Sequence, residues 1–288
     1  MINNISAPIP LSINLKGNLL LLDKPVVMGV LNITKDSFYE KSRFQNNDDL
    51  ITQTKKMLSA GAAIIDVGAA SSRPGAKLIN AEEEVELLLP ALHNLLQHFP
   101  EAIFSIDTYN SKTAIAAAEM GAALINDISA GAIDDQMFST IAALNIPYVM
   151  MHMQGVPEHM QNLPKYDDVV QETIQYFVQK VEIARQAGIK DIIIDPGFGF
   201  GKSLEHNFML LKNLKLFEVF QLPILCGLSR KSFINRVINT TADEALNGTT
   251  VLNTIALLNG ANILRVHDAL EAKQTIDLVN YYSNTNEL

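Results

Sequence analysis

Short apolar runs alternate with longer amphipathic segments along most of the 288-residue chain. Eight of these runs are three to six residues long, which is the length of strands buried in a parallel sheet. They span residues 26–31, 63–67, 103–106, 123–128, 147–151, 192–194, 223–228 and 262–266. The segments between them have the period of amphipathic helices, most clearly at 50–58, 82–96, 169–187 and 242–258.

Cap residues mark several expected helix ends. Asn80 precedes an acidic first turn at 82–84, and Asp48 or Asp49 precedes the first expected helix. Four glycines stand just past a helix and before a strand, where a left-handed C-cap belongs. They are Gly61, Gly121, Gly188 and Gly260. The pattern therefore predicts eight strand–helix units.

Eight such units predict an α/β fold, the (β/α)8 TIM barrel, with helices outside a parallel ring. Before them, apolar runs at 11–15 and 19–22 flank a short glycine turn and predict a β-hairpin that closes the N-terminal mouth of the barrel. We expect one domain over 1–288, with the hairpin in 1–24 and the barrel in 25–283. A doubly wound open sheet is the alternative, but it has fewer strands and a glycine-rich phosphate loop after the first one.

Composition excludes several classes of function. The formal net charge is −9 and no Lys/Arg-rich run is present, which argues against nucleic-acid or anionic-membrane partners. No apolar run approaches the ~20 residues of a membrane span. Cys226 is the chain's single cysteine and lies in an apolar run, which predicts a buried, inert thiol. With no basic segment near the N-terminus to suggest a signal peptide, we expect a cytoplasmic protein.

Polar side chains stand at the ends of nearly all the expected strands, which meet at one rim of a parallel barrel. Some of them are explained as caps of the following helices, among them Thr108, Asp127 and Asp268. The others divide into two groups. Carboxylates and an amide, suited to a heterocycle that carries an amino group and a ring N–H, occur at Asp107, Asn126 and Asp195. Cationic groups suited to a phosphate or diphosphate occur at Lys231, Arg265 and His267.

The segment 195–202, which reads DPGFGFGK, combines several of these features. A carboxylate ends a strand, and three glycines that permit left-handed backbone or close approach alternate with Phe198 and Phe200. This favours a flat heterocycle next to an anion over a simple glycine-rich turn. We expect Lys202 to lie at the start of the next helix or on the outer rim.

Several motifs, taken together, resemble the dihydropteroate synthase family. They occur in the family's order between residues 26 and 268, about one to a strand. The motifs are MGVLNITKDSF at 28–38, DVGAASSRPG at 66–75, SIDT at 105–108, INDIS at 125–129, MHMQG at 151–155, DPGFGFGK at 195–202, SRKS at 229–232 and RVHD at 265–268. The first two loops depart from the family's pattern at Lys35, at 39–41 and at Ala69-Ala70.

The resemblance implies a transferase that joins (7,8-dihydropterin-6-yl)methyl diphosphate to 4-aminobenzoate for folate synthesis. It also implies Mg²⁺ as cofactor, a homodimer, and inhibition by sulfonamides. It implies that the pterin is bound by Asp107, Asn126, Asp195 and Lys231. It places Mg²⁺ and the diphosphate on Asn32, and the diphosphate also on Arg265 and His267. It assigns 4-aminobenzoate to Ser72, Arg73, Phe200 and Ser232. The expected catalytic residues are Asp36, Asp107 and Lys231.

These roles suit an SN1-like loss of Mg-bound diphosphate, because the cation left on the methylene group is conjugated with the pterin ring. A carboxylate such as Asp36 or Asp107 would stabilise that cation, and no protein nucleophile is needed. Two alternatives stay open. A methyltetrahydrofolate:corrinoid methyltransferase would share the acid and amide group but has no need of the SRKS segment at 229–232. A non-catalytic pterin-binding paralogue predicts a degraded anion site, whereas Asn32, Arg265 and His267 are all present.

Overall fold

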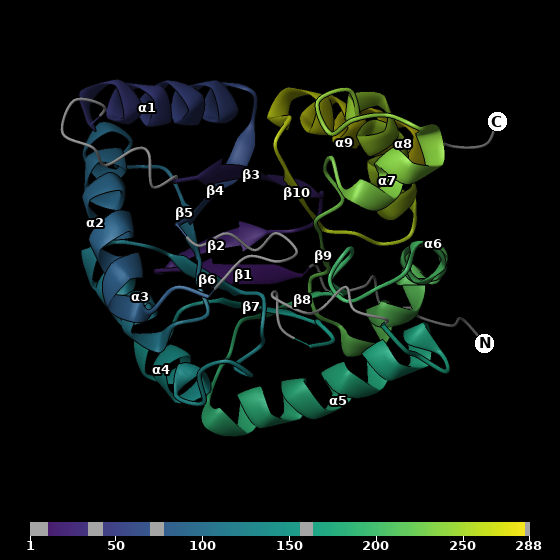
Figure 1. Cartoon of the computed structure of the whole chain (residues 1–288), viewed down its shortest axis with the longest axis horizontal. Coiled ribbons are helices and arrows are strands. Elements are labelled where there is room, and N and C mark those ends of the chain that lie inside the picture. The colour runs from purple at the N-terminus through teal and green to yellow at the C-terminus, as the bar shows by residue number, and fades with distance from the viewer. Residues whose placement is uncertain (1–10, 34–42, 70–77, 156–163, 286–288) are drawn as a thin grey trace, which may run out of the picture.

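The structure, a computed structural model, describes residues 11–33, 43–69, 78–155 and 164–285, with the side chains of the first helix from residue 48 onward. Eight parallel strands form one sheet in the order β8-β7-β6-β5-β4-β3-β10-β9 (Figure 1). Their bounds are β3 Val26–Asn32, β4 Ala62–Gly68, β5 Phe104–Asp107, β6 Leu124–Asp127, β7 Tyr148–Met151, β8 Ile192–Asp195, β9 Leu225–Cys226 and β10 Ile263–Val266. A single bridge, Ile194 to Ile224, joins the two edges of the sheet and nearly closes the ring. The (β/α)8 barrel prediction is confirmed.

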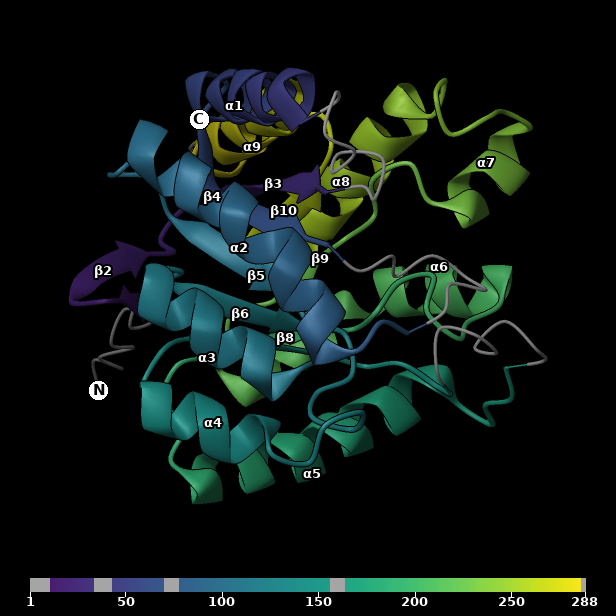
Figure 2. The ribbon, with the colours of Figure 1, turned by 60° about the vertical axis from the view of Figure 1, so that its left-hand side comes forward.

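Helices cover the outside of this ring (Figures 1 and 2). They are α1 Arg43–Ser59, α2 Ala81–His98, α3 Ser111–Met120, α4 Met137–Leu144, α5 Val169–Ala187, α6 Leu204–Lys212, the 3-10 helix η2 Leu214–Phe220, α7 Ser232–Ile238, α8 Leu246–Leu258 and α9 Ala269–Ser283. Their apolar faces pack on the outward side chains of the strands. Helices also pack on one another: Phe177 of α5 is fully buried, and its ring lies 6.2 Å from that of Phe217 in η2, edge to face. The helices are therefore held by burial of one apolar face.

The cap predictions have mixed outcomes. The Asn80 side chain accepts a hydrogen bond from the Glu83 backbone N–H at 2.8 Å, which confirms this N-cap. The four predicted C-terminal glycines all have positive φ angles, between 93° and 138°. The cap at Asp48 or Asp49 is wrong, because α1 begins at Arg43 and both residues lie inside it. Its first turns carry few apolar residues, so the periodic apolar pattern starts later than the helix does.

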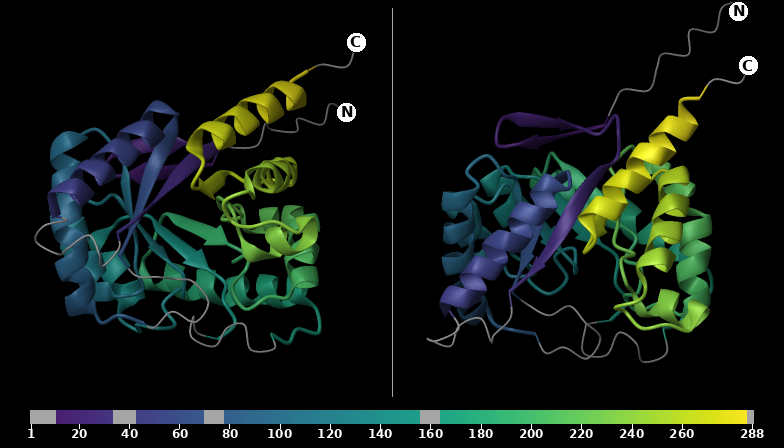
Figure 3. Two further views of the ribbon diagram at one scale, coloured as in Figure 1. Left: turned by 45° about the horizontal axis from the view of Figure 1, so that its top comes forward. Right: turned by 90° about the horizontal axis from the view of Figure 1, so that it is seen from above.

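The predicted hairpin is formed by β1 Ser12–Leu15 and β2 Asn18–Leu21, which pair antiparallel. Lys16 and Gly17 form its two-residue turn with φ angles of 53° and 91°, as a type I′ turn requires. Figure 3 shows the hairpin lying across one end of the strands. Its inward side chains, Ile13 and Leu15, pack with Leu22 on apolar residues of the strands. These residues are Met28, Ile64, Leu124, Val149, Ile193, Leu225 and Ile263. The hairpin thus closes the N-terminal mouth as predicted.

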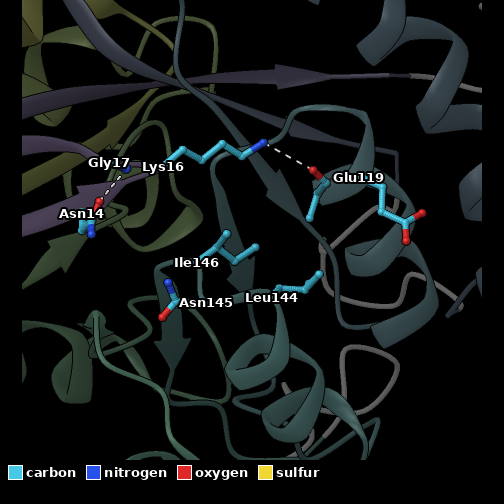
Figure 4. Close-up of a pocket in the computed structure, with 8 residues that line it drawn as sticks. Asn14, Lys16, Gly17, Glu119, Leu144, Asn145 and Ile146 are labelled. Carbon is cyan, nitrogen blue, oxygen red and sulfur yellow. Dashed lines mark hydrogen bonds between the residues drawn. The ribbon is translucent and has the colours of Figure 1, made fainter.

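Two exposed hydrogen bonds also join the hairpin to the barrel. The backbone N–H of Asn14 donates to Asp191 at 3.1 Å. Lys16 Nζ donates to the Ala118 carbonyl at 3.3 Å, as Figure 4 shows. A cavity of about 480 Å³ lies between the turn and the C-terminal ends of α3 and α4, where Glu119 and Asn145 line it. This cavity is at the N-terminal end of the strands, so it is separate from the predicted site at the other end.

Two predictions from composition can be compared with the structure. Cys226 is fully buried in β9, and burial raises its pKa well above the ordinary value of a thiol. The predicted burial of this thiol is therefore confirmed, and burial of this kind makes a thiol less reactive. Among the described helices, none combines the length and the apolar character that crossing a membrane requires.

Candidate active site

The carboxyl ends of the strands bring most of the predicted site residues to one rim. Asp107 ends β5 and Asn126 lies in β6, and the parallel register pairs these two residues directly. Asp195 ends β8, while Arg265 lies in β10. Figure 2 shows α6 and α7, which follow this rim, on the side of the barrel opposite the hairpin.

Arg265 joins two carboxylates inside the rim. Its Nε donates to Asp66 Oδ2 at 2.6 Å, and its Nη2 donates to Asp107 Oδ2 at 2.7 Å. Asn126 Nδ2 donates to the same Asp66 oxygen at 2.9 Å. The sequence placed Arg265 with the cationic group and Asp107 with the acidic group, whereas the structure links them in one hydrogen-bonded cluster.

Asp66 is the member of this cluster to which the sequence assigned no role. It lies inside β4 and is 0% exposed, and its Oδ1 has no hydrogen-bond partner within the described residues. The available signal was a lone carboxylate in a strand of otherwise apolar and small residues. A buried carboxylate needs paired charge and hydrogen bonds, so a partner on a neighbouring strand is expected. Here it orients both Arg265 and Asn126.

Burial dominates the electrostatics of the cluster. It raises the pKa of Asp107, an effect that Arg265 opposes and the nearby Asp66 reinforces. The two carboxylates in turn raise the pKa of Arg265. The guanidinium therefore stays charged and opposes protonation of Asp107, but burial still leaves the pKa of Asp107 at about 7.

The loop after β8 forms the facing wall. The Gly197 backbone N–H donates to Asp195 Oδ1 at 2.8 Å. Lys231 Nζ donates to the Phe198 carbonyl and lies 4.5 Å from the centroid of the Phe200 ring. Burial raises the pKa of Asp195, and Lys231 opposes that shift. Burial also lowers the pKa of Lys231 to about 8, with Asp195 opposing. The Lys231 ammonium group thus lies near the Asp195 carboxylate and over the Phe200 ring.

The glycines of this loop serve mainly to pack it on the neighbouring strand. Gly197 has a φ of 73°, and a Cβ there would lie 1.9 Å from the His152 carbonyl oxygen. Gly201 has a φ of 60°, and its Cβ would lie 2.5 Å from the Gln154 carbonyl oxygen. Left-handed backbone is confirmed at both positions, and what it allows is close contact with the end of β7.

Lys202 directly precedes Ser203, the N-cap of α6, so its placement at a helix start is confirmed, but its placement on the outer rim is wrong. Its side chain is 3% exposed, and Nζ lies 3.0 Å from His152 Nδ1. Burial lowers the pKa of Lys202 to about 7, and that of His152 to about 2. His152, which follows β7, is buried as well.

His267 and Arg230, the cationic residues farther out on the rim, have other hydrogen-bond partners than Arg265. His267 is exposed, and its Nδ1 lies 3.1 Å from Ser229 Oγ. The predicted pairing of Arg265 and His267 on one anion is therefore not preformed, because Arg265 is bonded to carboxylates inside. Arg230 donates to both oxygens of Asp268, each at 2.8 Å, and so holds the loop before α7.

The remaining predicted residues are partly visible. Asn32 is exposed at the end of β3, Ser232 is exposed at the start of α7, and Phe200 is half-buried. Asp36, Ser72 and Arg73 lie outside the described residues.

Comparisons with known proteins agree with this geometry. Residues 28–267 match the family model described as "Pterin binding enzyme". The chain is 41% identical over 266 residues to dihydropteroate synthase of Escherichia coli (strain K12), covering 92% of this chain and 94% of that protein. It is 40% identical over 249 residues to the Haemophilus influenzae enzyme of the same name, covering 86% and 90%.

Solved structures show the same relationship. Dihydropteroate synthase of Yersinia pestis, solved with a sulfonamide drug complex, superposes with a TM-score of 0.89 at 36% identity, covering 96% of this chain and 100% of that chain. The Xanthomonas albilineans enzyme with 4-aminobenzoic acid superposes with a TM-score of 0.88 at 32% identity, with the same coverage of both chains.

Proposed function

Since the chain belongs to the pterin-binding enzymes and, among them, to the dihydropteroate synthases, we propose how its own residues carry out that family's reaction. It is a transferase that condenses (7,8-dihydropterin-6-yl)methyl diphosphate with 4-aminobenzoate, giving 7,8-dihydropteroate and diphosphate in folate biosynthesis. Family membership favours this function over a corrinoid methyltransferase or a non-catalytic paralogue. The observation that supports the residue roles best is the buried cluster of acids and cations at the carboxyl ends of the strands.

The pterin binds between Asp195 and Asn126 in this proposal. The amide nitrogen of Asn126 is directed to Asp66, which leaves its amide oxygen as an acceptor for the pterin amino group. Asp195 accepts from the amino group and a ring N–H, and Lys231 donates to a ring acceptor. Asp107 completes the pocket next to Arg265. A site built from these groups rejects heterocycles that lack the matching N–H groups.

The diphosphate binds on the cationic side. Arg265 uses Nε and Nη2 for the two carboxylates, and its Nη1 makes no hydrogen bond within the described residues, so we assign Nη1 to a phosphate oxygen. His267, exposed on the same rim, provides a second donor. Asn32 offers an amide oxygen, a ligand type that suits Mg²⁺ when substrate phosphates and water provide the rest. When bound, Mg²⁺ would supply positive charge that stabilises the leaving diphosphate.

Bond breaking precedes bond making in the proposed mechanism. The methylene carbon–oxygen bond breaks and its electron pair leaves on the diphosphate. The resulting cation is delocalised into the pterin ring and lies near the carboxyl group of Asp107, which its positive charge would help to ionise, with Asp36 as a second candidate carboxylate. The amine of 4-aminobenzoate then forms the carbon–nitrogen bond and releases a proton. Arg265 favours this sequence because its charge opposes protonation of Asp107 and because it would also contact the leaving group.

The second substrate is assigned to the outer part of the slot. The Phe200 ring lies under the Lys231 ammonium group, and Ser232 is exposed at the start of α7. Ser72 and Arg73 are assigned to the same subsite by family resemblance. Sulfonamides, as mimics of 4-aminobenzoate, should compete for it. We further propose that the protein is cytoplasmic, because its composition is acidic and its single thiol is buried. We propose a homodimer on family resemblance alone.

One assay tests the function. The purified chain is incubated with the pterin diphosphate, Mg²⁺ and 4-aminobenzoate, while diphosphate release and dihydropteroate are followed together. Turnover that needs both organic substrates is expected, as is competition between a sulfonamide and 4-aminobenzoate. Tight pterin binding without turnover would instead support the non-catalytic alternative.

A further inference from the structure

Lys202 is a buried lysine whose ammonium group lies among backbone carbonyls. Nζ lies 2.9 Å from the carbonyl oxygen of Gly197, 3.1 Å from that of Phe200 and 3.2 Å from that of His152. The fourth neighbour is His152 Nδ1 at 3.0 Å. The strongly lowered pKa of His152 keeps its ring neutral, so Nδ1 can accept a hydrogen bond. Burying an ammonium group is costly unless such acceptors surround it, so this is a built site for the lysine.

These contacts join the ends of two strands. His152 follows β7, whereas Gly197 and Phe200 belong to the loop after β8. The His152 backbone N–H also donates to the Asp195 carbonyl at 2.9 Å. With Gly197 packed directly on the His152 carbonyl, the lysine ties the inner part of the loop to β7.

The tied segment carries the groups that face Lys231. Lys231 Nζ donates to the Phe198 carbonyl and lies over the Phe200 ring. Lys202 holds the carbonyls of Gly197 and Phe200, one on each side of the segment that contains Phe198. We propose that Lys202 is a positioning residue. It fixes where the Phe198 carbonyl and the Phe200 ring lie relative to Lys231 and the bound substrates. This inference rests on the proposed function, because that function assigns Lys231 and Phe200 to the substrates.

Other contacts hold the outer part of the same loop. The Tyr166 hydroxyl donates to the Gly201 carbonyl at 3.0 Å, and the Gly199 N–H donates to Asn207 Oδ1 at 2.6 Å. Loss of the lysine is therefore expected to loosen residues 196–201 locally without unfolding the barrel. A residue that acted only through global stability would loosen the whole molecule instead.

The test removes the ammonium group while keeping an unbranched apolar stem of similar size. Lys202→Met removes every donor, and Lys202→Gln keeps amide donors on a shorter side chain. Lys212→Met, at the exposed end of α6, is the matched control. Amide hydrogen exchange is measured on the free proteins, and KM and kcat are measured for both substrates.

We expect exchange in 196–201 to be roughly tenfold faster or more in Lys202→Met, because local openings lose hydrogen bonds that oppose them. Lys202→Gln should give a smaller increase, and Lys212→Met none. Exchange in the hairpin, residues 11–22, should stay unchanged in all three variants. The KM for 4-aminobenzoate should rise on the order of tenfold in Lys202→Met, and more than the KM for the pterin diphosphate, because Phe200 shifts while Asp195 stays in its strand.

Several results would overturn the inference. Exchange and kinetics in Lys202→Met that match Lys212→Met would show that the lysine holds nothing. Faster exchange across the whole barrel, with KM values unchanged, would show a role in stability alone. If Lys202→Met does not fold, Lys202→Gln decides by the same criteria. Absence of turnover in the wild type would contradict the proposed function, while the exchange data would still decide whether Lys202 holds the loop.

Discussion

The two ends of the barrel are built from different kinds of side chain. At the N-terminal end, Ile13 and Leu15 of the hairpin pack on apolar strand residues such as Met28, and all three are buried. At the carboxyl end, buried positions hold ionisable groups such as Asp107 and Lys202. Apolar burial stabilises the folded protein at the N-terminal end. Desolvation of charged groups at the carboxyl end offsets part of that stabilisation.

The pKa shifts at the carboxyl end show that desolvation disfavours the charged forms of these groups. Burial raises the pKa of Asp107 and Asp195, and it lowers that of Lys202 to about 7 and of Lys231 to about 8. Each shift favours the neutral form, so the charged forms are destabilised until a ligand of opposite charge arrives. Groups of this kind concentrate at functional sites. The hairpin end can therefore supply stability that the substrate end gives up.

The largest effect is expected from Arg265→Met. This change removes a donor to the diphosphate and leaves Asp66 and Asp107 without their cation, so kcat/KM should fall on the order of 10²- to 10³-fold. Steady-state kinetics with both substrates measures it. Arg236→Met, an exposed arginine in α7, is the control and should change kcat/KM less than about twofold. A loss no larger than that of the control would remove Arg265 from the chemistry.

Ile13→Ala tests the other end. Ile13 is 1% exposed, so its truncation should lower the free energy of unfolding by ~2–4 kcal/mol. Urea unfolding measures this loss, and kcat/KM should stay within about twofold where the variant is folded. A fall in kcat/KM without a lower free energy of unfolding would contradict the view that the hairpin end contributes stability and not activity.

The pH dependence of stability tests the buried charge at Lys202. In the unfolded chain this lysine stays protonated up to its ordinary pKa of 10.5, whereas in the folded protein its pKa is about 7 and it loses its proton above that value. The unfolded state therefore binds more protons between these values, and the unfolding free energy rises with pH by up to ~1.4 kcal/mol per unit from this group. The difference between wild type and Lys202→Met should shift in favour of wild type from pH 7.5 to 9. A pH-independent difference would mean that the lysine is not desolvated.

Lys16→Met should have the smallest effect. Lys16 is exposed at the hairpin turn and donates a hydrogen bond to the Ala118 carbonyl. The unfolding free energy should change by less than about 0.5 kcal/mol, since apolar side chains hold the hairpin. If the free energy of unfolding fell as much as in Ile13→Ala, measured by the same urea titration, polar contacts and not apolar burial would hold the hairpin on the barrel.

The sequence was sufficient for the barrel and for the rim where the site lies. Short apolar runs and glycines such as Gly188 report strand and helix ends directly, because backbone conformation there depends on local residue type. The start of α1 was missed because its first turns are largely polar. Convergence of Asp107, Asn126 and Asp195 also followed, since parallel strands put their carboxyl ends on one side.

Side-chain partners could not be derived in the same way. Asp66 and Arg265 are 199 positions apart, and their contact depends on the orientation of two side chains across the ring. Lysines are nearly always exposed, so the sequence favoured the rim for Lys202. Its burial follows from carbonyls that converge only in the folded loop.

The central claim is that one rim binds the pterin through Asp195 and the diphosphate through Arg265. Isothermal titration calorimetry with the pterin diphosphate and with the same pterin lacking diphosphate tests it directly. Asp195→Ala should weaken both ligands to a similar extent, because both carry the pterin ring. Arg265→Met should weaken the diphosphate ligand at least ~10-fold more than the free pterin. Equal losses of both ligands in both variants would contradict the claim.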